Sequence, residues 1–158
     1  GVVIGRNLLY GNDSHGLVIG GDAADIVNNT IALNGGDGIR FEDCGCGTNN
    51  NFWNNLVYDN GGFGLDAIAG TTADSLGTNY VFDNDGGDTA GSAADLALSA
   101  SDEIGSLDPE LTAAFTLSRT SPCRNGGQFL AGSPDSNDTD SGNFYGGEVD
   151  VGAWESPR

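Results

Sequence analysis

The sequence contains no lysine and no methionine, and its five basic residues, all arginine, stand against 23 acidic residues. The formal net charge is therefore −18. Phosphate groups and anionic lipid surfaces are bound mainly by clustered Lys and Arg side chains, so we expect no nucleic-acid partner and no binding to anionic membranes. An acidic surface without lysine fits a secreted, a halophilic or a calcium-loaded protein, and all three alternatives stay open here.

Long apolar runs are also missing, so no segment is predicted to cross a bilayer, and no secretory signal peptide is visible. Cysteine is scarce, with Cys44, Cys46 and Cys123 alone. A bond between Cys44 and Cys46 would be strained, whereas pairing of either with Cys123 is geometrically easier. A zinc site at the Cys-Gly-Cys segment lacks a second pair of ligands, because His15 is the only histidine.

What the sequence does contain is 27 glycines, many Asn and Asp residues, and short Val/Ile/Leu triplets that recur along most of the chain. This mixture is typical of many short strands joined by tight turns. The length of 158 residues suits one domain with a real core.

One pattern occurs four times, with an asparagine at each end of a strand-like segment: Asn7-Leu-Leu-Tyr-Gly-Asn12, Asn29-Thr-Ile-Ala-Leu-Asn34, Asn55-Leu-Val-Tyr-Asp-Asn60 and Asn79-Tyr-Val-Phe-Asp-Asn84. The segments start 22, 26 and 24 residues apart. A glycine and an aliphatic residue follow the first three: Gly16-Leu17, Gly38-Ile39 and Gly64-Leu65.

A period of this length predicts one coil of three short strands and three turns, with coils stacked about 4.8 Å apart. Residues of equal rank then form columns. We expect an inward aliphatic column of Leu9, Ile31, Val57 and Val81, and stacked amides at Asn12, Asn34, Asn60 and Asn84. The repeated glycine should lie at a corner that needs either φ > 0 or close backbone approach. A leucine-rich repeat is the alternative solenoid, but its leucine spacing and helical segments are missing.

The repeat resembles that of the right-handed parallel β-helix of pectin-lyase-like proteins. The tail is similar to the C-terminal region of bacterial secreted and surface β-helix proteins, which ends in an Asp-Ile-Gly-Ala-Tyr/Phe-Glu motif. The matching residues are Leu107-Asp-Pro109, Phe115-Thr-Leu117, Ser121-Pro-Cys123 with Gly126, and Val149-Asp-Val-Gly-Ala-Trp-Glu155. The loop from Asp135 to Gly142 departs from that family because it lacks the usual Arg. The resemblance implies fold and an extracellular setting, but no single activity.

We therefore predict an all-β fold: a right-handed parallel β-helix of about four coils over residues 1–95, closed by a C-terminal cap over residues 96–158. The cap would protect strand edges that otherwise invite association. The edge at Gly1 is expected to be uncapped, so that earlier coils precede it or subunits stack on it and self-associate.

Three candidate sites follow. Arg40, beside Glu42, Asp43 and Asp66 on an outward strand face, is a candidate base for a polysaccharide lyase or epimerase; the alternative is a surface ion pair between Arg40 and Asp66. An outward aromatic stripe of Tyr10, Tyr58, Tyr80 and Phe82 would stack on sugar rings, or be covered by Phe115–Leu117, by Phe144-Tyr145 or by another subunit. Asp135, Asn137, Asp138 and Asp140 are candidate Ca²⁺ ligands in one loop, where a solvated turn is the alternative.

Glycosylation sequons begin at Asn12, Asn28 and Asn137. No cofactor is expected to be required, although Ca²⁺ fits the acidic loop. The favoured function is a non-catalytic extracellular or cell-surface protein, such as a stalk, adhesin or filament module, with a polysaccharide or glycan as candidate partner. A purely self-associating module and the C-terminal part of a polysaccharide lyase or epimerase remain the alternatives.

Overall fold

The computed structural model describes residues 1–21, 23–42, 50–67, 73–91, 103–104, 107–124, 126–127 and 151–152, and its strands form three parallel sheets. The first sheet contains β1 (Val2–Gly5), β4 (Ala24–Val27), β7 (Asn50–Trp53) and β10 (Ala73–Gly77). The second contains β2 (Leu8–Tyr10), β5 (Thr30–Ala32), β8 (Leu56–Tyr58), β11 (Tyr80–Phe82) and β13 (Glu103–Ile104). The third contains β3 (Leu17–Ile19), β6 (Ile39–Phe41), β9 (Phe63–Ala67) and β12 (Gly87–Gly91).

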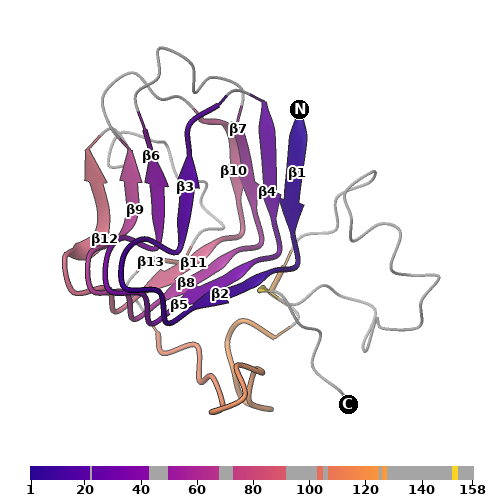
Figure 1. Cartoon of the computed structure of the whole chain (residues 1–158). Helices are drawn as coiled ribbons and strands as arrows, with labels where there is room; N and C mark the ends of the chain where they lie inside the picture. The colour runs from indigo at the N-terminus through magenta and orange to yellow at the C-terminus, as the bar shows by residue number, and fades with distance from the viewer. Residues whose placement is uncertain are drawn as a thin grey trace.

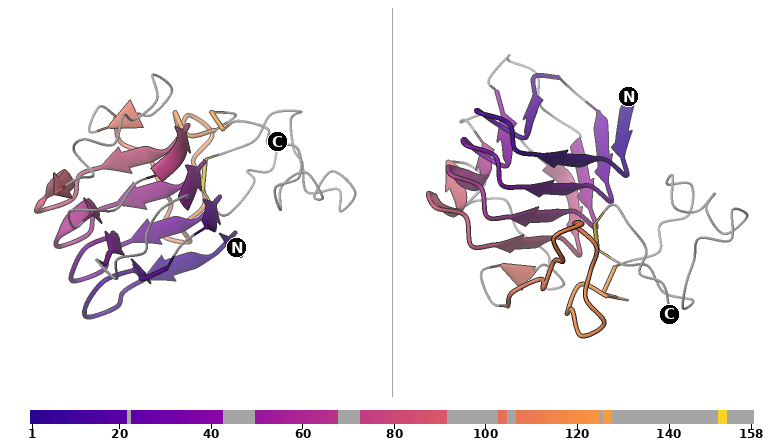
Figure 2. Two further views of the ribbon diagram at one scale, coloured as in Figure 1. Left: turned by 90° about the horizontal axis from the view of Figure 1, so that it is seen from above. Right: turned by 60° about the horizontal axis from the view of Figure 1, so that its bottom comes forward.

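The chain visits the three sheets in turn and so winds into a solenoid (Figure 1). The strands β1–β3 form the first coil, β4–β6 the second, β7–β9 the third and β10–β12 the fourth, and β13 adds to the edge of β11. Figure 2 shows equivalent strands lying directly over one another. Every ladder between these strands is parallel, which confirms the predicted β-helix.

The strand register confirms the predicted columns. Leu9 pairs with Ile31, Ile31 with Val57, and Val57 with Val81. The last three side chains are fully buried, while Leu9, in the end coil, is partly buried. Because side chains alternate in direction along a strand, the residues on either side of this column point outward.

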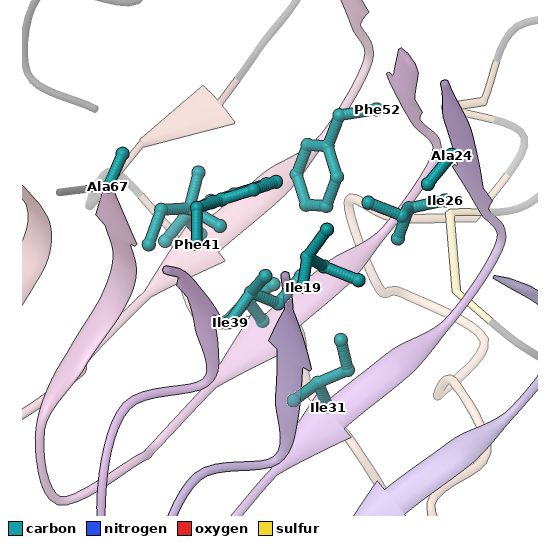
Figure 3. Close-up of a cluster of buried hydrophobic side chains, with 11 residues drawn as sticks. Ile19, Ala24, Ile26, Ile31, Ile39, Phe41, Phe52 and Ala67 are labelled. Carbon is teal, nitrogen blue, oxygen red and sulfur yellow. The ribbon is translucent and has the colours of Figure 1, made fainter. Parts of the chain in front are cut away.

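The core lies between the three sheets and is filled by one or two inward residues from most of the strands (Figure 3). Phe41 and Phe52 are its largest members, and both are at least 95% buried. One isoleucine from each of the successive strands β3 to β6 lies in the same cluster, together with Ala24 and Ala67. Burial of this aliphatic column is the main favourable term in folding, at about 25 cal/mol for each Å² removed from water.

At two of the corners in each coil, a single residue adopts the left-handed backbone conformation with a positive φ. The corner between the first and second sheets is at Arg6, Asn28, Asn54 and Thr78, and the corner after the second sheet is at Gly11, Leu33, Asp59 and Asp83. Their φ angles lie between 52° and 66°. Only glycine and, to a lesser degree, Asn and Asp adopt this conformation readily, so Leu33 is strained there.

Of the two predicted reasons for the repeated glycine, a positive φ or close backbone approach, the structure supports close approach. A Cβ at Gly38 would lie 2.4 Å from a methyl group of Val57 and 2.8 Å from the Gly64 carbonyl oxygen. Gly16 and Gly64 meet the corresponding atoms at 2.5 and 2.8 Å. None of the three has a positive φ, so the absence of a side chain is what the fold requires.

Candidate functional site

Two columns of asparagine side chains run through the coils. In the first, Asn29 Oδ1 accepts hydrogen bonds from the backbone N–H of Asn7 at 3.0 Å and from its side-chain amide at 2.9 Å. The same pair of bonds joins Asn29 to Asn55 and Asn55 to Asn79. The second column, Asn12, Asn34, Asn60 and Asn84, repeats this geometry and confirms the predicted amide stack.

Each interior asparagine also donates its amide to a carbonyl of the preceding coil, as Asn55 does to Ile26 at 2.8 Å and Asn60 to Ile31 at 3.2 Å. Buried amides are tolerated only when their donors and acceptors are satisfied. The interior asparagines therefore hold the coils together, and their buried side chains are not available to a ligand.

Arg40 projects from β6 into a group of charged side chains drawn from three coils. Its Nη1 lies 3.3 Å from Asp66 Oδ2 and 3.3 Å from Asp37 Oδ2. The strand register places Val18, Arg40 and Asp66 in one outward column, as predicted. Glu42 is exposed, and Asp43 lies outside the described residues.

His15 and Asp37 complete this group, and sequence reasoning missed both. The Asp37 backbone N–H donates to His15 Nδ1 at 3.0 Å, and Asp37 Oδ2 lies 3.1 Å from the same nitrogen. Both contacts are made to Nδ1, so this nitrogen of His15 faces Asp37. Aligning the coils on their glycines would have revealed this column, because His15, Asp37 and Phe63 each precede the repeated glycine.

Asp37 is buried and fully engaged. Its Oδ1 accepts the backbone N–H of Phe63 at 2.8 Å, while Oδ2 faces Arg40 and His15. Imidazole, carboxylate and guanidinium are groups that acid–base catalysis uses. Here each contacts another member of the group, and the contacts join the first three coils. We call His15, Asp37, Arg40 and Asp66 the charged cluster.

The aromatic residues predicted to form an outward stripe do share the outer side of the second sheet. Tyr10, Tyr58 and Phe82 occupy one column, which the fully buried Ala32 interrupts. The rings of Tyr58 and Phe82 are stacked with centroids 5.9 Å apart. Tyr80, two residues before Phe82, is only 3% exposed.

Residues of the predicted cap cover this side of the sheet. Leu117, Cys123 and Val151 form a second apolar cluster with Leu56 and Tyr80, against which Tyr58 and Phe82 pack. Phe115 lies against Tyr10 with ring centroids 4.5 Å apart. The segment from residue 107 to 124 runs along the outside of the second sheet in Figure 1. Tyr10, at 53% exposed, is the stripe residue with the most accessible surface.

Carboxylates border the stripe. Burial, followed by the nearby charges of Asp83 and Asp85, raises the pKa of Asp59 above its ordinary value. Burial and then the charges of Asp108, Asp59 and Asp83 raise the pKa of Tyr58. Both directions mark a crowded negative surface around the end of β8.

Other predicted positions fall outside this surface. The Ca²⁺ candidates Asp135, Asn137, Asp138 and Asp140, the sequon at Asn137, and Cys44 and Cys46 lie outside the described residues. Asn12 is exposed, whereas Asn28 is only 3% exposed, which disfavours glycan attachment there. Within the described ranges, no group of three or more His, Cys, Asp or Glu is arranged to hold a metal ion. No helix in the part of the chain that the structure describes is long and apolar enough to cross a membrane.

Comparison with protein families returned one match that fits this geometry. A family model described as a right-handed β-helix region matches residues 1–85, more than half of the chain. The chain belongs to the right-handed β-helix family. The match ends just before β12, so it spans nearly all of the coils of this β-helix protein. Comparisons with curated proteins and with solved structures found no match.

Proposed function

We propose that this β-helix protein is a non-catalytic, rigid module of the cell surface or extracellular space, acting as a stalk, adhesin or filament element. The ion pairs of Arg40 with Asp37 in its own coil and with Asp66 in the next coil carry the proposal. An arginine that acts as a base must face its substrate, whereas Nη1 of Arg40 contacts two carboxylates of the protein itself at 3.3 Å. The asparagine columns also support a structural role, because their polar side-chain atoms bind other coils of the same chain.

The strongly acidic, lysine-free composition supports an extracellular setting. The resemblance of the repeat to pectin-lyase-like proteins, and of the tail to bacterial surface β-helix proteins, supports the same extracellular setting. Glycan binding is part of the proposal too, through Tyr10 and its neighbour Phe115, where the cap leaves an aromatic ring accessible. Glycan binding is tested on a glycan array with the wild-type protein and with Tyr10→Ala, which should bind less. If the wild-type protein binds no glycan, this part of the proposal is wrong.

The alternative, part of a polysaccharide lyase or epimerase, draws on the gathering of His15, Asp37 and Arg40 at one place. Arg40→Ala separates the two functions. Arg119→Ala is the matched control, because Arg119 is exposed and its substitution removes the same charge. A panel of uronate polymers is incubated with all three proteins, with unsaturated products followed by absorbance and epimerised residues by NMR.

We expect no turnover by any of the proteins, and a lower melting temperature for Arg40→Ala alone. The loss should correspond to about 1 kcal/mol, the upper end for a partly exposed ion pair. Turnover by the wild type and Arg119→Ala that disappears in Arg40→Ala would establish the enzyme instead.

A further inference from the structure

The outer face of the first sheet carries a tryptophan that belongs neither to the core nor to the charged cluster. Strand β7 sends Phe52 into the core, where it and Ile26 point inward (Figure 3). Because side chains alternate in direction along a strand, Asn51 and Trp53, on either side of Phe52, point outward. Trp53 is half-buried and is a member of neither apolar cluster in the described part of the chain.

The strand register shows what lies beside the indole of Trp53. Val27 of β4 and Gly77 of β10 are its neighbours in the same outward column. Val27 is only 3% exposed and Gly77 is buried, although both positions face outward. This burial fits an indole that lies across the sheet, with one face on its two neighbours and the other face outward. The accessible part of Trp53 is therefore a rigid aromatic plane.

A carboxylate and an amide lie at one edge of this plane. Asp25 of β4 and Asn51 of β7 are paired in the register, and Asn51 Nδ2 donates to Asp25 Oδ1 at 2.6 Å. Both residues are half-buried. They precede Val27 and Trp53 by two residues, so they lie on the same outer face about 7 Å farther along the strands. A carboxylate can accept several hydrogen bonds, so the bond from Asn51 leaves acceptor capacity at Asp25.

We propose that Trp53, Asp25 and Asn51 form a glycan-binding site for neutral hexopyranose units. The apolar face of a pyranose ring stacks on the indole, while the hydroxyl groups at the edge of the sugar donate hydrogen bonds to the carboxylate. The separation of about 7 Å between the indole and the polar pair matches the width of one sugar ring. The inference rests on the glycan binding proposed above, but it uses residues of a different sheet from Tyr10.

The charge of the surface selects among glycans. Asp25 is the ionisable member of the site, and the whole chain carries a formal net charge of −18. A uronate polymer would bring further carboxylates to this surface, and like charges repel each other. A polymer of neutral hexoses brings hydroxyl donors without a charge. Neutral hexose chains therefore bind at Trp53, and uronate chains do not.

Fluorescence of a single tryptophan tests the site. The sequence contains two tryptophans, so Trp154→Phe leaves Trp53 as the only indole. Cellohexaose, maltohexaose and mannohexaose are titrated into this protein, with hexagalacturonate as the charged comparison. We expect a saturable change in Trp53 emission with at least one neutral hexamer and none with hexagalacturonate. Calorimetry on the unsubstituted chain should give the same affinity. No response to any neutral hexamer, or equal affinity for hexagalacturonate, would overturn the proposal.

A substitution at the polar pair tests the role of the carboxylate. Asp25→Asn keeps an acceptor oxygen for Asn51 and removes the charge, so we expect it to weaken binding of the responding hexamer about tenfold. Asp85→Asn is the control, because it removes the same charge from an exposed position between the second and third sheets. It should leave the affinity unchanged. Equal affinity of the two variants would overturn the role of Asp25.

Tyr10→Ala separates this site from the glycan binding proposed above. We expect the response of Trp53 to the neutral hexamer to persist in Tyr10→Ala, because the two residues lie on different sheets. Array binding that disappears in Tyr10→Ala while Trp53 emission never responds would support the site at Tyr10 and overturn the site at Trp53. A saturable response of Trp53 without any binding that depends on Tyr10 would do the reverse.

Discussion

The side-chain oxygen of Asn60 accepts two hydrogen bonds from Asn34, one from its backbone N–H at 3.1 Å and one from its side-chain amide at 2.9 Å. The Asn60 amide in turn donates to Asn84 Oδ1 at 2.8 Å and to the carbonyl oxygen of Ile31 at 3.2 Å. One buried side chain therefore joins three coils, and it needs both an acceptor oxygen and a donor nitrogen to do so.

Asn60→Asp is expected to lower the free energy of unfolding by about 3 kcal/mol or more, because a carboxylate cannot donate to Asn84 and Ile31 and is costly to bury. Asn12→Asp is the control, since Asn12 is exposed and stands at the end of the same column. It should cost less than about 1 kcal/mol. Urea unfolding compares the two, and equal losses would show that the column has no special role in stability.

Gly38→Ala tests the close approach of successive coils. The added methyl group would lie 2.4 Å from a methyl of Val57, so we expect a loss of about 1–3 kcal/mol from overpacking. Gly21→Ala is the matched substitution, because a Cβ there meets nothing within 4 Å. Thermal unfolding of both variants should show a lower melting temperature for Gly38→Ala only. A neutral Gly38→Ala would mean that the coils separate easily at this corner.

Leu33→Asn should stabilise the protein. Leu33 is exposed and holds a φ of 56°, a conformation that asparagine adopts at lower cost than leucine. We expect a gain of about 0.5–1 kcal/mol in chemical unfolding. Leu107→Asn removes another exposed leucine, one without a positive φ, and it should give no such gain. The prediction fails if the two variants shift stability alike.

Asp59→Asn should raise stability at neutral pH and lose this advantage in acid. Burial and the charges of Asp83 and Asp85 raise the pKa of Asp59 in the folded protein, so ionised Asp59 opposes folding. Stability from this group is fully present below the unfolded pKa and is lost as pH rises through the folded pKa. The melting temperatures of wild type and variant should therefore differ at pH 7 and converge near pH 3. A difference between the two proteins that stays constant from pH 7 to pH 3 would contradict this prediction.

Leu117→Ala should loosen the cap from the second sheet. Leu117 packs against Leu56 and Tyr80, and truncation of a buried leucine costs about 2–5 kcal/mol. We expect faster amide exchange in residues 107–124 and greater exposure of Tyr80, measured by hydrogen exchange and tyrosine fluorescence. Unchanged exchange in that segment would mean that Leu117 does not hold it.

The repeat by itself determined the coils, their parallel pairing, the aliphatic column and the asparagine columns. When a chain winds with a fixed period, residues of equal rank must stack, so the spacing of Asn7, Asn29, Asn55 and Asn79 already contains the register. The outward column of Val18, Arg40 and Asp66 followed from the same alignment.

Only the tertiary structure decided which neighbour each outward side chain takes. Arg40 reaches Asp37, three residues earlier in the same coil, and strand periodicity does not encode this contact. The docking of Leu117, Cys123 and Val151 on Leu56 and Tyr80 joins segments far apart in the chain that share no repeat. Periodic order can be recognised in a sequence because every coil repeats it, whereas a contact made once leaves no pattern and is selected by packing alone.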